Sequence, residues 1–212
     1  MEIGFALLKN NKIIKMQKGL KLDVRDIAKE IKNTDYDWAL FHTRLASVGD
    51  KLDKNCHPFK RKDILMAMNG TEHSVDFISS TKEMTDTEAI IDILDKYNLG
   101  ITALRRFSSI FMGFYKSKPF VVADNTHNIE ILYNKKNNAK VFASSFPNSF
   151  KKNIFEPNKC FSWYDGKMPN NLVKKKIRYM RYKDLYYDDD FYGQYIWNLN
   201  YFEGEDDYEK VV

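Results

Sequence analysis

The sequence predicts an α+β fold, and the order of its apolar patterns carries this prediction. Strand-like segments open the chain, helical and strand-like segments then alternate, and four short strand-like segments follow one another. Such an order is typical of helices that cover one sheet or a pair of sheets. The length of 212 residues suits one domain with an appendage, and it is enough to bury a core without disulfides or metals.

A hairpin and a helix are predicted first. Residues 3–7 and 13–16 alternate apolar with other side chains, and the two asparagines at 10–11 are a turn signal between them. Asp23 then stands at an N-cap position, before apolar residues at helical spacing, and residues 33–35 close the helix.

Short apolar runs predict the remaining strands. Residues 38–42 and 64–68 are typical of buried strands, and Asn69-Gly70 ends the second of them. Further along, turns rich in Lys, Pro, Asp and Asn separate four more runs, which predict an antiparallel meander. These runs are residues 110–115, 120–123, 129–133 and 141–144.

The second helix is predicted from its first turn. Thr85 or Asp86 begins it, and Glu88 stands where a capping-box partner of Thr85 is expected. Apolar residues between 90 and 94 continue at helical spacing, and Gly100 ends the helix.

Composition excludes several classes of protein. With 43% hydrophobic, 30% charged and 15% aromatic residues, the chain is neither collagen-like nor wholly disordered. No apolar run is long enough to cross a membrane. The N-terminal residues show no signal or transit peptide, so we expect a cytoplasmic protein without a membrane partner.

The cysteines and histidines do not predict a metal site. Cys56 and Cys160 are too few for a disulfide framework, and we expect both to be reduced thiols. Cys56, His57 and His73 come nearest to a ligand set, but no second spaced pair accompanies them. We therefore expect neither a metal nor another cofactor.

Charge is distributed unevenly along the chain. The net charge is +5, but residues 171–183 carry six basic side chains and no acid, while residues 184–212 carry nine acids and one lysine. Without an Arg-rich helix face or an aromatic-glycine signature, this pattern disfavours nucleic-acid binding. We expect one domain over residues 1–170, followed by a C-terminal extension over residues 171–212 that is first basic and then acidic and aromatic. The aromatic end of this extension either is solvated or docks on the domain, on a second copy or on another protein.

Polar residues gather at strand ends between residues 42 and 88. Arg44 follows a buried strand and offers a planar fork for a carboxylate. Asn69 and Gly70 follow another strand, and their amide and backbone N–H groups suit a developing oxyanion. Asp86 offers an acceptor for an ammonium group, so together these residues describe a pocket for an α-amino acid with a reactive carbonyl. Taken singly, they are also explained as a surface ion pair, a turn and a helix cap.

Four sequence blocks stand in a fixed order. They are His-Thr-Arg-Leu-Ala-Ser-Val-Gly at 42–49, Asn-Cys-His-Pro at 55–58, Met-Asn-Gly-Thr at 68–71 and Thr-Asp-Thr-Glu at 85–88. In this order and spacing, the chain resembles the class II glutamine amidotransferases of the N-terminal-nucleophile hydrolase superfamily over residues 1 to about 165. The resemblance implies a four-layer αββα sandwich, followed here by the C-terminal extension.

The resemblance also implies a role for each polar residue. Arg44 would hold the α-carboxylate of glutamine and Asp86 its α-amine, while Asn69 with Gly70 would form the oxyanion hole. Ser47 stands where a threonine usually lines the pocket. Glutamine or glutamate is then the expected small-molecule ligand.

The chain departs from this family at the nucleophile. The family uses an N-terminal cysteine whose free α-amine is the general base, whereas this chain has Glu2 and is expected to retain Met1. Leu45 and Met68 also replace the usual Trp and His. We therefore expect no catalytic residue and no glutaminase activity. The pocket is expected either to bind an amino acid weakly or to be filled by Glu2, with its carboxylate paired to Arg44.

Three functions remain open. The first is an inactive glutamine-amidotransferase-like protein that acts by binding or assembly, through the amino-acid pocket or through residues 171–212. The second is an active amidotransferase or amidohydrolase that uses glutamine or a related amide and an unrecognised nucleophile. The third is a structural subunit of a larger assembly.

Overall fold

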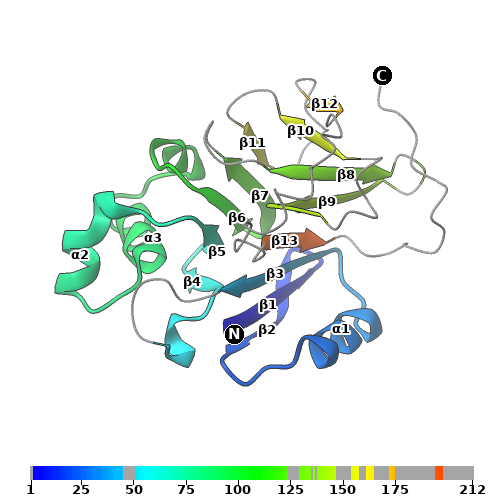
Figure 1. Ribbon diagram of the computed structural model, residues 1–212, viewed down its shortest axis with the longest axis horizontal. Coiled ribbons are helices and arrows are strands. Elements are labelled where there is room, and N and C mark those ends of the chain that lie inside the picture. Colours follow the sequence, from blue (N-terminus) through cyan, green and yellow to red (C-terminus); the bar gives the residue numbers. More distant parts are fainter. Residues whose placement is uncertain are drawn as a thin grey trace, which may run out of the picture.

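The computed structural model describes most of the chain up to residue 164 and two strands beyond it. The described residues are 2–44, 51–123, 129–134, 136, 138–146, 154–157, 161–164, 172–174 and 194–197. They form helices and two sheets in which every described strand pairing is antiparallel, so the predicted α+β class is confirmed (Figure 1). Among these residues, no helix has the length and apolar character needed to cross a membrane.

The larger sheet has eight strands. The N-terminal hairpin lies at one edge, and a strand from the C-terminal part of the chain lies at the other. From that far edge, the strands follow in the order β12 (Leu172–Lys174), β10 (Phe155–Pro157), β8 (Glu130–Asn134), β9 (Ala139–Ala143), β13 (Gln194–Trp197), β3 (Trp38–Arg44), β1 (Glu2–Lys9) and β2 (Lys12–Gly19).

The smaller sheet has five strands. Their order is β11 (Phe161–Tyr164), β7 (Lys118–Ala123), β6 (Ile110–Tyr115), β5 (Ile64–Asn69) and β4 (Phe59–Arg61). The predicted meander is therefore wrong as a single unit, because β6 and β7 pair in this sheet while β8 and β9 pair in the larger one. The physical reason is that both sheets bury a face in a common core, so an apolar run need not pair with its neighbour in sequence.

The helical segments are short. The α-helices are α1 (Val24–Asn33), α2 (Asp76–Thr81) and α3 (Asp86–Lys96), and the 3-10 turns are η1 (Asp53–Asn55), η2 (His73–Val75) and η3 (Ile101–Arg106). The sequence predicted α1 and α3 but not α2, which has only six residues and buries none of them. Such a helix has too few apolar positions to show a helical period.

Local signals set the hairpin and the first helix as predicted. Asn10 and Asn11 have φ angles of 49° and 58°, the left-handed backbone that a tight hairpin turn requires and that Asn tolerates. Asp23 is the N-cap of α1, and its carboxylate accepts a hydrogen bond from the backbone N–H of Arg25. Both features act within a few residues, which is why the sequence shows them.

The ends of α3 are set by two capping motifs. Thr85 is the N-cap, and it forms the predicted capping box with Glu88. The helix ends at Lys96, so the prediction that it runs to Gly100 is wrong. Asn98 takes the left-handed conformation at φ 50°, and the backbone N–H of Leu99 donates to the carbonyl of Leu94, as in a Schellman motif.

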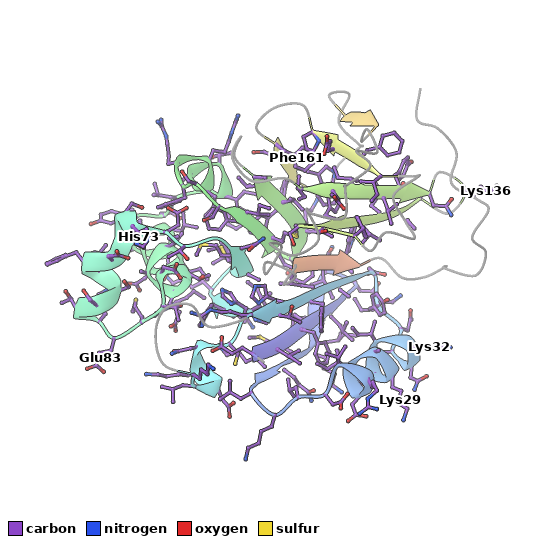
Figure 2. All side chains as sticks on the ribbon, in the orientation of Figure 1. Lys29, Lys32, His73, Glu83, Lys136 and Phe161 are labelled. Carbon is purple, nitrogen blue, oxygen red and sulfur yellow. The ribbon has the colours of Figure 1, made fainter. Side chains whose placement is uncertain are left out.

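The largest cluster of buried side chains lies between the two sheets. β1 contributes Ala6 and Leu8, β5 contributes Leu65 and Ala67, and Phe161 joins them from β11 (Figure 2). Since successive residues of a strand point to opposite faces, even-numbered residues of β1 and odd-numbered residues of β5 face the other sheet.

Helices cover the opposite faces of these strands. Phe5 of β1 shares a buried cluster with Ile31 of α1, whereas Lys29 on the same helix is exposed (Figure 2). Met66 of β5 shares a separate cluster with Ile90 of α3. The two helices thus pack on different sheets. Each helix covers the outer face of its sheet, and the inner face packs in the cluster between the two sheets.

The C-terminal part of the chain contributes to the larger sheet. Strand β13 pairs with β3 on one side and with β9 on the other. Among the alternatives for the aromatic end of the extension, residues 194–197 dock on the domain, and the rest of residues 184–212 lies outside the described residues. Without β13, the strands β2-β1-β3 and β9-β8-β10-β12 would be two separate groups.

Candidate functional site

Two strands bring charged side chains to the end of the inter-sheet core. On β1, Glu2 and Gly4 continue the alternation of Ala6 and Leu8, which face the other sheet. On the neighbouring strand β3, Arg44 is the register partner of Glu2. The alternation that builds the apolar core therefore also points Glu2 toward the inside of the fold.

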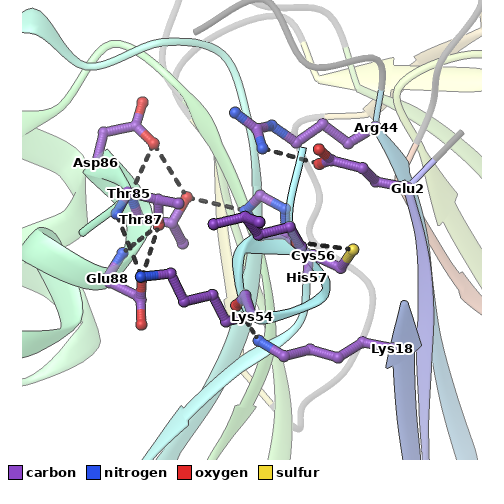
Figure 3. Close-up of polar contacts among 11 residues, drawn as sticks. Glu2, Lys18, Arg44, Lys54, Cys56, His57, Thr85, Asp86, Thr87 and Glu88 are labelled. Carbon is purple, nitrogen blue, oxygen red and sulfur yellow. Dashed lines mark hydrogen bonds and ion pairs between the residues drawn. The ribbon is translucent and has the colours of Figure 1, made fainter. Parts of the chain in front are cut away.

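Glu2 and Arg44 form a buried ion pair. Nη1 of Arg44 donates to Oε2 of Glu2 at 2.8 Å, and the side chains are 17% and 2% exposed respectively (Figure 3). The predicted pairing of Glu2 with Arg44 is confirmed, and the pair is not a surface feature. The guanidinium fork is thus already engaged by a carboxylate of the same chain.

Two buried histidines lie beside this pair. The rings of His42 and His57 have centroids 4.2 Å apart, and Nε2 of His57 is 2.9 Å from Oγ1 of Thr87 (Figure 3). Burial lowers the pKa of His42 to about 3, outweighing a hydrogen bond with the backbone of Met68. Burial and the nearby charges, including Arg44, lower the pKa of His57 well below its usual value. Both rings are therefore neutral at neutral pH.

Gly4 allows the His57 loop to approach β1. A Cβ atom at residue 4 would collide with the carbonyl oxygen of His57 and would crowd Cβ of Lys18 on the neighbouring strand β2. Glycine at this position therefore lets the backbone of the loop lie directly on the strand.

Lys18 adds a positive charge on the other side of this loop. Its Nζ donates to the carbonyl of Lys54 at 2.8 Å and lies 4.1 Å from the ring centroid of Phe59 (Figure 3). Burial lowers the pKa of Lys18, and the charge of Glu88 partly opposes that shift. The charge of Lys18 in turn contributes to the lowered pKa of His57.

Asp86 lies at the start of α3 and is held by backbone groups. Its Oδ1 accepts from the N–H of Thr87 at 2.8 Å, and its Oδ2 accepts from the N–H of Glu72 at 3.1 Å. The helix cap is Thr85, so the interpretation of Asp86 as a cap is wrong. Through Thr87, Asp86 is connected to the buried histidines.

Gly70 and Ser109 surround a buried carboxylate. Glu72 is 5% exposed and accepts hydrogen bonds from Oγ of Ser109 at 2.7 Å and from Oγ of Ser74 at 3.4 Å. Gly70 has a φ of 132°, and a Cβ there would collide with Oγ of Ser109. Glycine is thus required at residue 70 by both backbone angle and space.

The other predicted site residues are placed differently. Asn69 is the last residue of β5 and is partly buried, and it continues the alternation of Leu65 and Ala67, which belong to the inter-sheet core. Ser47 and Cys160 lie outside the described residues.

The remaining candidate ligands do not form a metal centre. Cys56 is buried, and its Sγ lies 3.7 Å from the carbonyl oxygen of Leu52. Burial, followed by the charges of Glu2 and Asp53, raises the pKa of the Cys56 thiol, which disfavours the thiolate. His73 is exposed and lies 3.0 Å from Asp76. The described residues contain no group of three or more His, Cys, Asp or Glu side chains that suits a metal ion.

The structure therefore joins residues from seven separate segments into one polar cluster. We call it the Glu2 cluster; its members are Glu2, Lys18, His42, Arg44, His57, Glu72, Asp86, Thr87, Glu88 and Ser109. Sequence reasoning assigned no role to Lys18, Glu72 or Ser109, because nothing in their sequence neighbourhood marks them. His42, His57 and Thr87 do lie within the sequence blocks that drew attention to this region.

Comparison with known proteins does not assign the chain to a family. Neither a scan against protein-family models nor a search of curated proteins found a match. The Glu2 cluster is therefore interpreted from its own geometry, with the sequence resemblance as the source of the leading hypothesis.

Proposed function

We propose that this chain is a glutamine-amidotransferase-like protein of class II whose amino-acid site is closed by its own Glu2. In this proposal the protein does not hydrolyse glutamine, and it acts by binding or assembly. The observation that carries the proposal is the buried ion pair between Glu2 and Arg44.

The packing of the fold supports this assignment. Buried clusters join α1 to the larger sheet, the two sheets to each other, and the smaller sheet to α3. We propose that this arrangement is the four-layer αββα sandwich of the N-terminal-nucleophile hydrolases. The sequence blocks that suggested that family contribute residues to the Glu2 cluster at the end of the inter-sheet core.

The chemistry of the cluster argues against hydrolysis. Glu2 is a poor nucleophile toward an amide, and its carboxylate is held by the cation that would otherwise bind the α-carboxylate of glutamine. Cys56 does not replace it, since the pKa of its thiol is raised and nucleophilic attack requires the thiolate.

Assembly is the proposed role of the C-terminal extension. Strand β13 pairs with β3 and with β9, so residues 194–197 are part of the larger sheet. We propose that the rest of residues 171–212 binds a protein partner or a second copy. A cytoplasmic location and a reduced Cys56 belong to the same proposal.

Two measurements on the purified chain test the proposal. A coupled glutamate assay is expected to show no release of glutamate from glutamine above background. Calorimetry is expected to show no binding of glutamine or glutamate to the wild type at a few millimolar. The Glu2→Ala variant removes the carboxylate that is paired with Arg44, and it is expected to bind at least one of them with a Kd of ~0.1–10 mM.

The double variant Glu2→Ala/Arg44→Ala is the matched control, since it lacks the cation that the freed site would use. It is expected to bind neither amino acid. Steady glutamate production that disappears in Arg44→Ala would overturn the claim of inactivity. Failure of a folded Glu2→Ala variant to bind either amino acid would overturn the claim that Glu2 occupies an amino-acid site.

A further inference from the structure

Two buried polar atoms of the Glu2 cluster have no hydrogen-bond partner within the part of the chain that the structure describes. They are Oε1 of Glu2 and Nδ1 of His57, on side chains that are 2% and 4% exposed. Buried polar atoms are nearly always paired, and an unpaired one costs about 1–3 kcal/mol. Two such atoms in one cluster point to a place where a further hydrogen-bonding group fits.

Both atoms are hydrogen-bond acceptors. The hydroxyl of Thr87 donates to Oδ1 of Asp86 at 3.5 Å, and hydrogen bonds to a charged acceptor are the stronger ones. Its single hydrogen is then used, so Nε2 of His57 carries the ring proton and donates to Thr87 at 2.9 Å. In this neutral tautomer, Nδ1 of His57 accepts, as the carboxylate oxygen of Glu2 does. The missing group is therefore a donor.

The charges of the cluster favour a cation. Carboxylates belong to Glu2, Glu72, Asp86 and Glu88, and the cations are Arg44 and Lys18. Among the described members of the Glu2 cluster, acidic side chains therefore outnumber basic ones by four to two. Figure 3 shows His57 between Thr87 and Asp86 on one side and the Glu2–Arg44 pair on the other. The charge of Arg44 acts on the His57 ring, and Thr87 occupies Nε2, which leaves Nδ1 for a group on the side of the Glu2–Arg44 pair.

We infer that the Glu2 cluster binds a small cation with N–H groups, either ammonium or a primary alkylammonium, which donates hydrogen bonds to Oε1 of Glu2 and Nδ1 of His57. The inference builds on the proposed function, because it concerns the same site and names the class of ligand that the unaltered site takes. With Arg44 neutralised by Glu2, the site has no free fork for a carboxylate and selects an amine without one. Since both acceptors are almost fully buried, the ligand is as small as ammonium or methylammonium.

Ring resonances of the four histidines test this inference directly. The uniformly ¹⁵N-labelled full chain is titrated with ammonium or methylammonium chloride at neutral pH, with sodium chloride keeping the ionic strength constant. We expect a saturable shift of Nδ1 of His57 in the millimolar range, while the exposed His73 stays unchanged. Tetramethylammonium has the same charge but no N–H group, and it is expected to give no such shift.

Variants separate the carboxylate of Glu2 from general charge effects. Glu2→Gln removes the charge at the site and is expected to weaken ammonium binding at least tenfold. Glu83→Gln removes an exposed carboxylate of the loop between α2 and α3, which is not a member of the Glu2 cluster, and it is expected to leave ammonium binding unchanged (Figure 2). If Glu2→Gln does not fold, the comparison of ammonium with tetramethylammonium on the wild type decides the question.

Three results would overturn the inference. The first is the absence of a saturable shift of the His57 Nδ1 resonance at tens of millimolar ammonium, which would indicate bound water in the site. The second is an equal shift of that resonance with tetramethylammonium. The third is a His57 ring that carries protons on both nitrogens at neutral pH. None of these results bears on the glutaminase assay or on amino-acid binding by Glu2→Ala. Failure of this inference is therefore distinguishable from failure of the proposed function.

Discussion

His57 and Thr87 share a 2.9 Å hydrogen bond that joins the loop before β4 to the first turn of α3. Both side chains are buried, and they are 30 residues apart in the sequence. This bond connects the two neighbouring histidine rings to Asp86, whose carboxylate accepts from the backbone N–H of Thr87. It is therefore the central link of the Glu2 cluster.

Removing the hydroxyl of Thr87 is expected to destabilise the protein. Thr87→Val keeps the shape of the side chain but leaves Nε2 of His57 unpaired, so we expect a loss of about 1–3 kcal/mol in the free energy of unfolding. Urea denaturation of the variant and the wild type measures this difference in the free energy of unfolding. Thr102→Val, at an exposed position, is the control and is expected to change stability by less than about 0.5 kcal/mol. Equal stabilities would contradict the role of this bond.

Adding one methyl group at Gly4 is expected to be costly. The Cβ of Gly4→Ala would collide with the carbonyl oxygen of His57, and the strand cannot move without disturbing its pairing with β2 and β3. We expect a loss of about 2–3 kcal/mol or more, measured by thermal and urea unfolding. At Gly100 the nearest atom to a new Cβ is 3.9 Å away and φ is −77°, so Gly100→Ala is expected to be neutral or slightly stabilising. If both variants lost stability equally, the close approach at Gly4 would not be the cause.

Stability is expected to fall as the pH drops below about 6.5. Burial lowers the pKa of His42 to about 3 and lowers that of His57, so the unfolded chain binds protons at these rings before the folded protein does. The stabilisation is complete above about pH 6.5 and is lost progressively as the pH falls toward the folded-state pKa values.

The slope of this loss is measurable. Between about pH 6.5 and 5, two buried histidines give a decrease in the free energy of unfolding of up to about 2–3 kcal/mol per pH unit. Urea denaturation across that range tests it, with the exposed His73→Gln as a control that should keep the slope. A flat profile above pH ~5 would show that the histidines are not buried as neutral rings.

Strand β13 is expected to hold the larger sheet together. A chain that ends at Trp197 keeps every described strand, whereas one that ends at Gly193 loses β13 and leaves β3 and β9 without a partner on one side. We expect the shorter chain to melt at a lower temperature or to associate through the exposed strand edges. Scanning calorimetry and size-exclusion chromatography compare the two. Identical behaviour would mean that β13 adds nothing to the sheet.

The sequence alone determined the features that depend on a few neighbouring residues. The sequence predicted the hairpin turn at Asn10 and Asn11, the Asp23 cap and the Thr85–Glu88 capping box. Left-handed turns and helix caps depend on a few neighbouring residues, so they can be predicted locally. Alternating residues in the hairpin and short continuous apolar runs elsewhere likewise indicated most of the described strands, and with them the α+β class. The end of α3 was misplaced because Asn98, and not Gly100, takes the left-handed position there.

Only the tertiary structure decided which strands share a sheet and which charges share a site. Apolar runs do not specify their partners, so the split of β6–β7 from β8–β9 and the insertion of β13 depend on how two sheet faces bury a common core. The sequence suggested Glu2 and Arg44 as partners only as one of two outcomes, and the pairing of β1 with β3 selected it. The sequence did not predict that Glu72, Ser109 and Lys18 belong to the site. The free energy of burying a polar group depends on its partners, and these lie far away in the sequence.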